Sequence, residues 1–119
     1  MITVYGIKNC DTVQRALTRL KAEGIEFRFH DFKSDGLSSE RAAQWIAALG
    51  VDSVVNRKGT TWRNLDAQAQ AKVAHSEGEA AKLLASNPSL VKRPVIESSK
   101  GITVGFAKGD EDAVLSRLR

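Results

Sequence analysis

The spacing of apolar residues changes several times along the chain, and each change predicts a new element. Residues 2–5 form a short apolar segment, after which apolar side chains recur at helical spacing from Thr12 to about Glu23. Residues 25–31 then alternate between apolar and polar side chains, as a half-buried strand does. A strand, a helix and a second strand in this order predict a parallel pair joined by a right-handed crossover.

The middle of the chain is predicted to be mainly helical. Apolar residues recur at helical spacing from Ala42 to Leu49, and a third helix is expected to begin near Trp62 or Asn64. The capping box Ser76-x-x-Glu79 predicts the start of a fourth helix. Residues 51–61 have no sustained period, so we interpret them as a loop with functional potential.

The last third of the chain returns to strand patterns. Residues 93–97 and 102–106 predict a hairpin around the turn Lys100-Gly101, and Asp110 is expected to cap a final helix. With 119 residues and no internal repeat, the chain fits one α/β domain. Its core is expected over about residues 1–37 and 88–119, with a helical insertion over about residues 38–87.

Composition and charge exclude several classes of function. The chain is 42% hydrophobic and 27% charged, which is typical of a soluble globular protein and not of a disordered one. Its net charge of +4 comes from scattered residues, a distribution that disfavours nucleic-acid binding but still fits a small anionic ligand. No apolar run reaches the length of a membrane span.

Cysteine usage points to a reducing compartment. A single cysteine forms no internal disulfide, no Cys/His cluster has metal-ligand spacing, and no signal-peptide pattern occurs at the N-terminus. Together these features predict a cytoplasmic protein without a metal site.

That single cysteine, Cys10, lies at the predicted start of the first helix. Unpaired N–H groups and the positive end of the helix dipole stabilise a thiolate, the nucleophilic form of cysteine. Lys8 adds a cation, whereas Asp11 opposes the thiolate unless its carboxylate caps the helix, as the spacing Asp11-x-x-Gln14 permits. A buried, unreactive cysteine fits the position equally well.

The neighbours of Cys10 each allow two interpretations. Thr12 either donates a hydrogen bond to the sulfur or caps the helix, and capping is the commoner role. Asn9 either shapes the loop or contacts a ligand, and Trp62 either packs in the core or lines a site. Neither histidine is tied to Cys10 by the sequence, so a cysteine–histidine hydrolase pair is not predicted.

Six short motifs occur in order along the chain. They are YGIKNCDT at residues 5–12, RFHD at 28–31, DGL at 35–37, RKGTTWRNLD at 57–66, KRP at 92–94 and VGF at 104–106. Their order and spacing resemble the arsenate reductase-like (ArsC/Spx) family, and its YffB branch in particular. The resemblance implies a thioredoxin-like α/β fold with a four-stranded mixed sheet and an inserted helical subdomain.

The resemblance also implies a site. Cys10 would be the nucleophile, which in arsenate reductases attacks the arsenic of a bound oxyanion before glutathione and glutaredoxin resolve the adduct. Pro94 would be a cis-proline facing this cysteine, and Arg93 matches the arginine that precedes that proline. Arg57 matches a second anion-binding arginine, with Lys58 one step away as the alternative. Asn9, Asp11 and Thr12 complete the candidate binding residues around the nucleophile.

Two departures from the family pattern narrow the chemistry. Phe106 stands where arsenate reductases have a third arginine, which weighs against arsenate reduction because positioned cations stabilise the charge on a transferred oxyanion. Cys10-Asp11-Thr12-Val13 lacks the second cysteine of a C-x-x-C motif. A redox cycle must therefore recruit an external thiol.

We therefore expect a glutathione-dependent thiol–disulfide oxidoreductase that uses Cys10 as a monothiol nucleophile. Glutathione is the expected co-substrate, with its carboxylates at Arg93, Arg57 or Lys58 and its peptide groups beside Pro94, and no tightly bound cofactor is expected. Glutaredoxin or a protein disulfide is the other candidate partner. The alternatives are an arsenate reductase and a non-enzymatic, Spx-like regulator that binds RNA polymerase.

Overall fold

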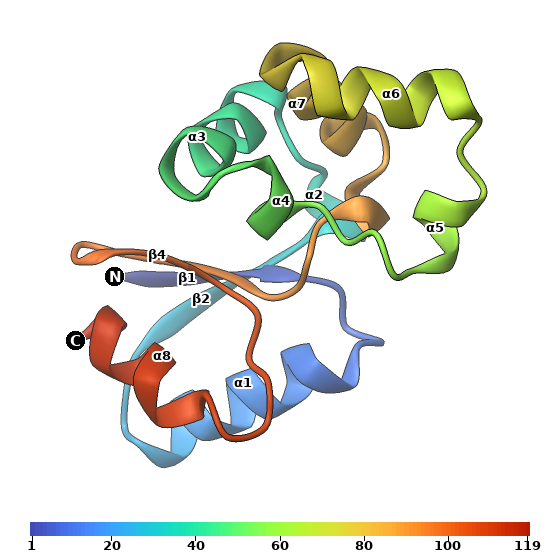
Figure 1. The fold of residues 1–119 in the computed structure, drawn as a ribbon. Coiled ribbons are helices and arrows are strands. Elements are labelled where there is room, and N and C mark those ends of the chain that lie inside the picture. The colour runs from blue at the N-terminus through green and yellow to red at the C-terminus, as the bar shows by residue number, and fades with distance from the viewer. The chain divides into compact units, whose positions relative to one another are not determined.

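Strands lie in the first and last thirds of the chain, and helices fill the middle (Figure 1). The computed structural model describes residues 1–119. In chain order the elements are β1 (Ile2–Gly6), α1 (Asp11–Ala22), β2 (Phe27–Asp31), α2 (Phe32–Asp35), α3 (Ser39–Leu49), α4 (Val51–Val54), α5 (Thr60–Arg63), α6 (Ala67–His75), α7 (Glu77–Ser86), the 3₁₀ helix η1 (Pro88–Leu90), β3 (Val95–Ser98), β4 (Gly101–Val104) and α8 (Glu111–Leu118).

These elements form two compact units. The first unit comprises residues 1–35 and 93–119, and it holds the strands with α1, α2 and α8. The second unit comprises residues 36–92 and holds α3 to α7 with η1. Residues 38–87, the expected helical insertion, lie within this second unit.

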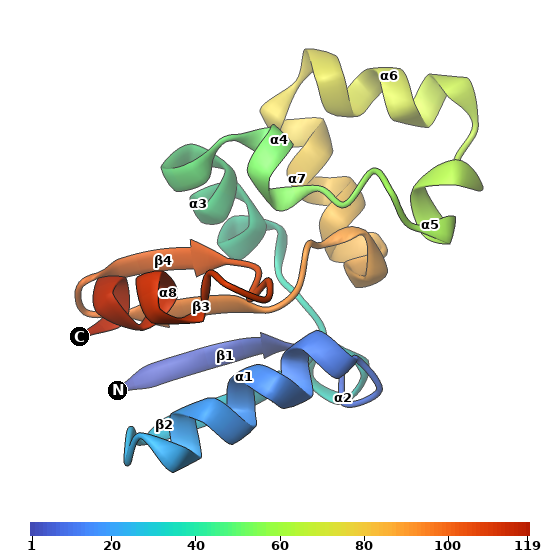
Figure 2. The same cartoon turned by 60° about the horizontal axis from the view of Figure 1, so that its bottom comes forward.

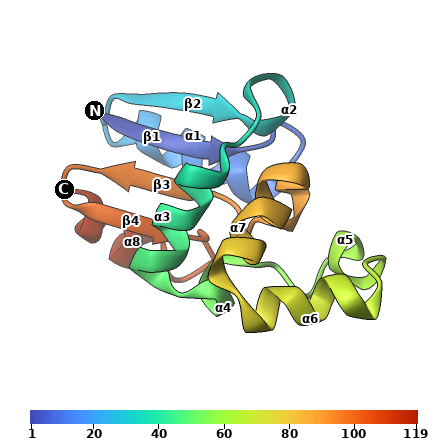
Figure 3. The ribbon, with the colours of Figure 1, turned by 90° about the horizontal axis from the view of Figure 1, so that it is seen from above.

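The first unit contains a four-stranded mixed sheet in the order β2-β1-β3-β4 (Figure 3). Strand β1 runs parallel to β2, with Tyr5 opposite His30, and antiparallel to β3, with Tyr5 opposite Val95. Strands β3 and β4 form the predicted hairpin, with Val95 opposite Val104. The prediction of a four-stranded mixed sheet is therefore confirmed.

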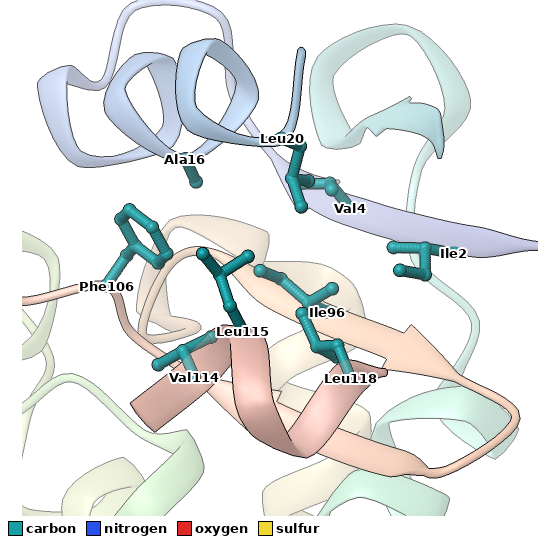
Figure 4. Close-up of a cluster of buried hydrophobic side chains, with 9 residues drawn as sticks. All are labelled: Ile2, Val4, Ala16, Leu20, Ile96, Phe106, Val114, Leu115 and Leu118. Carbon is teal, nitrogen blue, oxygen red and sulfur yellow. The ribbon is translucent and has the colours of Figure 1, made fainter. Parts of the chain in front are cut away.

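The core of the first unit lies between the sheet and the two helices α1 and α8, which cover the same face of the sheet (Figure 1). Strand alternation in β1 directs Ile2 and Val4 to this face, and the helical spacing of α1 directs Ala16 and Leu20 to meet them (Figure 4). The other buried members of this cluster are Ile96, Phe106, Val114, Leu115 and Leu118.

Phe106 is a core residue, with 1% of its surface exposed. Its ring points into the cluster, toward Ala16 and Leu115 (Figure 4). The Arg15 guanidinium lies 5.9 Å from the centroid of this ring and donates a hydrogen bond of 2.6 Å to the Phe106 carbonyl. Arg15 also pairs with Glu111 at 3.1 Å, so the segment that carries Phe106 is tied to α1 by both packing and charge.

A second ionic network joins the C-terminal end of α1 to both ends of α8. Arg19 donates to Asp112 at 2.7 Å and to Glu23 at 3.2 Å, and Arg119 donates to Glu23 at 2.7 Å. The bond to Asp112 is the main cause that raises the pKa of Arg19, and the bond from Arg119 is the main cause that lowers the pKa of Glu23. Because the pKa of Glu23 is lowered, its contribution is present at neutral pH and is lost as the pH falls through that pKa. These groups are solvent-exposed, so the contribution is small.

The second unit is built around α3 and α7. Trp45 and Ile46 of α3 are buried, as are Ala81 and Leu84 of α7, and these faces supply most of the unit's apolar core. Trp45 has no exposed surface and is a core residue of this unit. The Ser76 hydroxyl accepts a hydrogen bond from the Glu79 N–H at 3.2 Å, so the predicted N-terminus of α7 is confirmed as well.

Several predicted boundaries were wrong. The predicted loop over residues 51–61 contains α4 and the start of α5, two single turns too short to show a helical period. The third helix begins only at Ala67, because the Asp66 carboxylate caps it by accepting the Ala69 N–H at 2.8 Å. Asp110 precedes α8 as predicted, but its side chain makes no capping hydrogen bond.

The burial of Phe106 predicts a stability effect. We expect Phe106→Ala to lower the free energy of unfolding by about 3–5 kcal/mol, because the change leaves a cavity in a closely packed core. Phe106→Leu should cost less, and Phe106→Arg should cost at least as much as alanine because it buries an unpaired charge. Both tryptophans belong to residues 36–92, so their fluorescence reports on the second unit. Unfolding of the first unit in urea is therefore best measured by hydrogen exchange of the β1 amides.

Lys108→Ala is the control for this series, since Lys108 is exposed and lies two residues away. An equal loss of stability in Phe106→Ala and Lys108→Ala would contradict the core role of the ring.

Candidate functional site

Cys10 is the N-cap residue of α1. Its backbone is extended, with φ −118° and ψ 120°, and its carbonyl accepts a hydrogen bond from the Gln14 N–H at 3.0 Å. The residue is partly buried, whereas Lys8, Asn9 and Asp11 around it are exposed. Cys10 is therefore not a fully buried core cysteine, which favours the reactive interpretation over the structural one.

Backbone contacts fix the loop that presents Cys10. The Gln14 side-chain amide donates a hydrogen bond of 2.9 Å to the Lys8 carbonyl, closing the loop between β1 and α1. At Gly6, a Cβ atom would lie 2.7 Å from Cγ2 of Val13, so only glycine allows β1 to pass this close to the first turn of α1. These contacts fix the path of the chain from β1 to α1 and place Cys10 at the start of the helix.

Neither predicted capping interaction is present. The helix begins at Asp11, one residue earlier than predicted, so the Asp11 carboxylate lies within the first turn and caps nothing. Gln14 uses its side chain on Lys8 and not on a capping box. The Thr12 hydroxyl forms a hydrogen bond neither as a cap nor with Cys10. The carboxylate of Asp11 still lies near the positive end of the helix dipole, where it is favourable.

Strand pairing brings Arg93 and Pro94 to the same end of the sheet as the Cys10 loop. Strand β1 ends at Gly6, and its neighbour Tyr5 pairs with Val95, the first residue of the antiparallel β3. The chain enters β3 from the end at which β1 leaves the sheet (Figure 2). The Arg93–Pro94 bond is cis, as the family resemblance implied.

The Arg93–Pro94 segment is well anchored. Pro94 is buried, and its carbonyl accepts a hydrogen bond of 2.8 Å from the Gly105 N–H. Arg93 is partly buried, with its Nε atom inside the protein. The first unit therefore brings together two sequence-predicted features, the Cys10 loop and the Arg93–Pro94 segment, at one end of a rigid sheet.

The other two candidate cations, Arg57 and Lys58, belong to the second unit. Arg57 donates a hydrogen bond of 2.6 Å to Asp52, and its guanidinium lies 5.4 Å from the centroid of the Trp62 ring. The Lys58 N–H donates to the Asn56 side chain at 3.1 Å, and the Lys58 carbonyl accepts from Arg63 at 2.7 Å. Trp62 therefore serves as a packing partner of a candidate binding arginine.

Arg57 and Lys58 line a small cavity within the second unit. Its volume is about 180 Å³, and its walls are Asp52, Val55, Asn56, Arg57, Lys58 and Lys92. Lys92 was not predicted as a site residue, although it is the first residue of the KRP motif. An isolated bridge between Val55 and Val91 places it there, and no local pattern in the sequence announces that contact.

His30 packs among aromatic side chains. Its ring lies 4.9 Å from the Tyr5 ring and 5.9 Å from the Phe32 ring. Tyr5 in turn donates a hydrogen bond of 3.0 Å to Glu97 on β3. These aromatic contacts join β1, β2 and α2 on the face of the sheet opposite the core cluster.

Known proteins are similar to this chain in sequence and in fold. The model of the ArsC family matches residues 5–114. The chain belongs to the ArsC family. Among its relatives, an uncharacterised protein of Haemophilus influenzae is 43% identical over 98% of this chain and 100% of its own length. The global transcriptional regulator Spx of Streptococcus pyogenes is 24% identical over 98% of this chain and 87% of its own.

Solved structures of ArsC proteins agree in fold. The YffB protein is similar with a TM-score of 0.89 and 38% identity, covering 100% of both chains. An arsenate reductase (ArsC) related protein from Brucella melitensis has a TM-score of 0.75 and 37% identity over 96% of this chain and 93% of its own. The chain therefore has the thioredoxin-like fold of the ArsC family. None of its helices combines the length and the apolar run that a bilayer-spanning segment needs.

The loop geometry predicts a local effect of Gln14. We expect Gln14→Ala to speed amide hydrogen exchange at residues 8–10 by about 2–10-fold, because one hydrogen bond contributes about 0.5–1.5 kcal/mol. The measurement is residue-resolved exchange by NMR. Thr18→Ala, on the exposed side of the same helix, is the matched control. Unchanged exchange at residues 8–10 would show that the Gln14–Lys8 bond does not hold this loop.

Proposed function

We propose that this ArsC-family protein is a glutathione-dependent thiol–disulfide oxidoreductase in which Cys10 is a monothiol nucleophile. The observation that supports it most is the position of the single cysteine, partly exposed as the N-cap of α1 at the sheet end where Arg93 and the cis-Pro94 lie. A thiolate at a helix N-terminus is stabilised by the unpaired N–H groups of the first turn.

A two-step exchange follows from the absence of a second cysteine. The Cys10 thiolate attacks the glutathione sulfur of a mixed disulfide, the substrate's S–S bond breaks, and the substrate thiolate leaves and takes up a proton. A second glutathione thiolate then attacks the Cys10–glutathione disulfide, which releases Cys10 and oxidised glutathione. In the net reaction the glutathionylated substrate and one free glutathione give the substrate thiol and oxidised glutathione, so the free glutathione is oxidised as the substrate sulfur is reduced.

Arg93 is the proposed partner of a glutathione carboxylate. A guanidinium offers planar, bidentate donation to a carboxylate, and such charge-assisted bonds are the stronger ones. Anchoring by the buried Pro94 limits the movement of this residue's backbone. Asn9, Asp11 and Thr12 around Cys10 complete the proposed contact surface, and one of Arg57 and Lys58 remains the proposed anion-binding residue of the second unit.

Arsenate reduction is the weaker alternative. A third arginine at position 106 would need its guanidinium in solvent, but this position lies in the core with 1% of its surface exposed. In a glutathione–glutaredoxin coupled assay we expect no arsenate turnover above the rate of Cys10→Ser. Turnover that depends on Cys10 would instead favour the oxyanion reductase.

The regulator alternative draws on the Spx relatives, which are about a quarter identical to this chain. An interaction module of this kind would not need the thiol chemistry. Cys10→Ser would then retain the biological function in a complementation test, whereas the proposed oxidoreductase would lose it.

Adduct formation tests the proposal directly. Incubation with oxidised glutathione followed by intact-mass measurement should show one glutathione on the wild-type chain and none on Cys10→Ser. We expect Arg93→Ala to slow adduct formation about tenfold or more, since a charge-assisted hydrogen bond contributes about 1.5–3 kcal/mol.

Two further variants control this experiment. Arg28→Ala removes an exposed arginine from β2 and should leave the rate unchanged. Arg93→Lys keeps the charge and separates lost binding from lost stability, with folding checked by circular dichroism. The proposal fails if no adduct forms where a free cysteine reacts, or if both Arg93 variants react at the wild-type rate.

A further inference from the structure

We propose that the cavity lined by Asp52, residues 55–58 and Lys92 binds a compact oxyanion group, a carboxylate or a phosphate. We assign the charge that holds it to Lys58 and Lys92, with Arg57 as a positioning residue. The carboxylate form of the ligand rests on the proposed function, because glutathione would supply it. The phosphate form does not depend on that function.

Two backbone hydrogen bonds build the cavity from distant parts of the chain. The Asn56 N–H donates to the Leu90 carbonyl at 2.7 Å, and the Lys92 N–H donates to the Val54 carbonyl at 2.7 Å. With the Val55–Val91 bridge between them, these bonds fix residues 54–56 beside residues 90–92. Lys92 and Lys58 therefore line the same small volume although they lie far apart in the sequence.

Arg57 is already engaged. Its guanidinium donates to Asp52 at 2.6 Å and lies over the Trp62 ring at 5.4 Å. A guanidinium with a carboxylate on one side and an aromatic ring beside it is largely compensated in charge. We assign it the role of orienting the segment before Lys58, and of the two candidates from the sequence we therefore assign anion binding to Lys58.

Lys58 and Lys92 are not compensated. Neither ammonium group forms an ion pair or a hydrogen bond with the protein. Two like charges facing one cavity raise the local positive potential, which attracts an anion. Asp52, on the wall of the same cavity, is the one carboxylate that opposes such a ligand, and it is committed to Arg57.

The volume limits what binds. About 180 Å³ corresponds to roughly six waters at their share of about 30 Å³ in the liquid. This space accepts an oxyanion group with part of its solvation shell, and it is too small for a whole tripeptide or nucleotide. Val55 supplies an apolar wall and Asn56 a polar one, so the ligand that fits presents a compact charged end.

Trp62 provides a reporter of occupancy, because an anion drawn into the cavity alters the field at the Arg57–Trp62 contact. We would titrate the full chain with inorganic phosphate and, separately, with S-methylglutathione, which carries the carboxylates but cannot form a disulfide. Trp62 fluorescence and the amide shifts of Asn56, Lys58 and Lys92 are followed at constant ionic strength. Saturable changes confined to these residues are expected with at least one probe.

Charge removal identifies the groups that hold the anion. We expect Lys58→Gln and Lys92→Gln each to weaken binding about tenfold, and the double variant to abolish measurable binding. Lys72→Gln makes the same charge change on α6, away from the cavity, and should leave the affinity unchanged. Equal weakening by Lys72→Gln, or wild-type affinity in the double variant, would overturn the assignment.

Asp52→Asn gives an effect of the opposite sign. It removes the opposing carboxylate and releases the Arg57 guanidinium, so we expect anion binding to tighten about threefold or more. The Asp52 side chain is 82% exposed, so the fold should tolerate the change. Weaker binding in Asp52→Asn would contradict the role given to Arg57.

The two probes separate the sources of the anion and the two proposals. Phosphate binding alone assigns the cavity to a free oxyanion, and S-methylglutathione binding that is lost in the double variant assigns it to a carboxylate. We expect Cys10→Ser to bind each probe as the wild-type chain does, because the thiol takes no part in this binding. If Cys10 forms no adduct but anions still bind at Lys58 and Lys92, the proposed function fails while the anion site remains.

Discussion

The pairing of β1 with two neighbours is the interaction on which the rest of the first unit depends. Parallel pairing with β2 sets the α1 crossover, and antiparallel pairing with β3 sets where Arg93 and Pro94 enter the sheet. The two features of the candidate site lie just beyond this strand pair: the Cys10 loop follows β1, and the Arg93–Pro94 segment precedes β3. A shift of the β1–β3 register by one residue would turn the apolar residues of one strand, Val4 of β1 or Ile96 of β3, out of the core, so burial fixes the site geometry through the register.

Much of this arrangement could be predicted from the sequence because it rests on local patterns. The apolar spacing of α1 and the alternation in β2 are strong, and the Ser76–Glu79 pair marks a helix start without any tertiary information. The prediction was weakest where single turns occur. The α4 and α5 turns are too short for a period, and their ends are decided by contacts such as that of Arg57 with Trp62.

Long-range contacts explain what the sequence could not predict at the site. Lys92 lines a cavity with Lys58 only because residues 90–92 bridge to residues 54–56, and nothing local encodes this pairing. Phe106 is the converse case. The family resemblance implies an anion-binding arginine at its position, whereas its burial makes it part of the packing between α1 and α8.

The Cys10 loop is held mainly by its backbone, and this has a consequence for specificity. Gly6 permits the close approach to Val13, the Cys10 carbonyl accepts the Gln14 N–H, and the Lys8 carbonyl accepts the Gln14 side chain. None of these contacts uses the side chains of Lys8, Asn9 or Asp11, which are exposed. The loop can therefore keep its shape while those three side chains change, so under the proposed function they would set substrate preference around Cys10 without moving it.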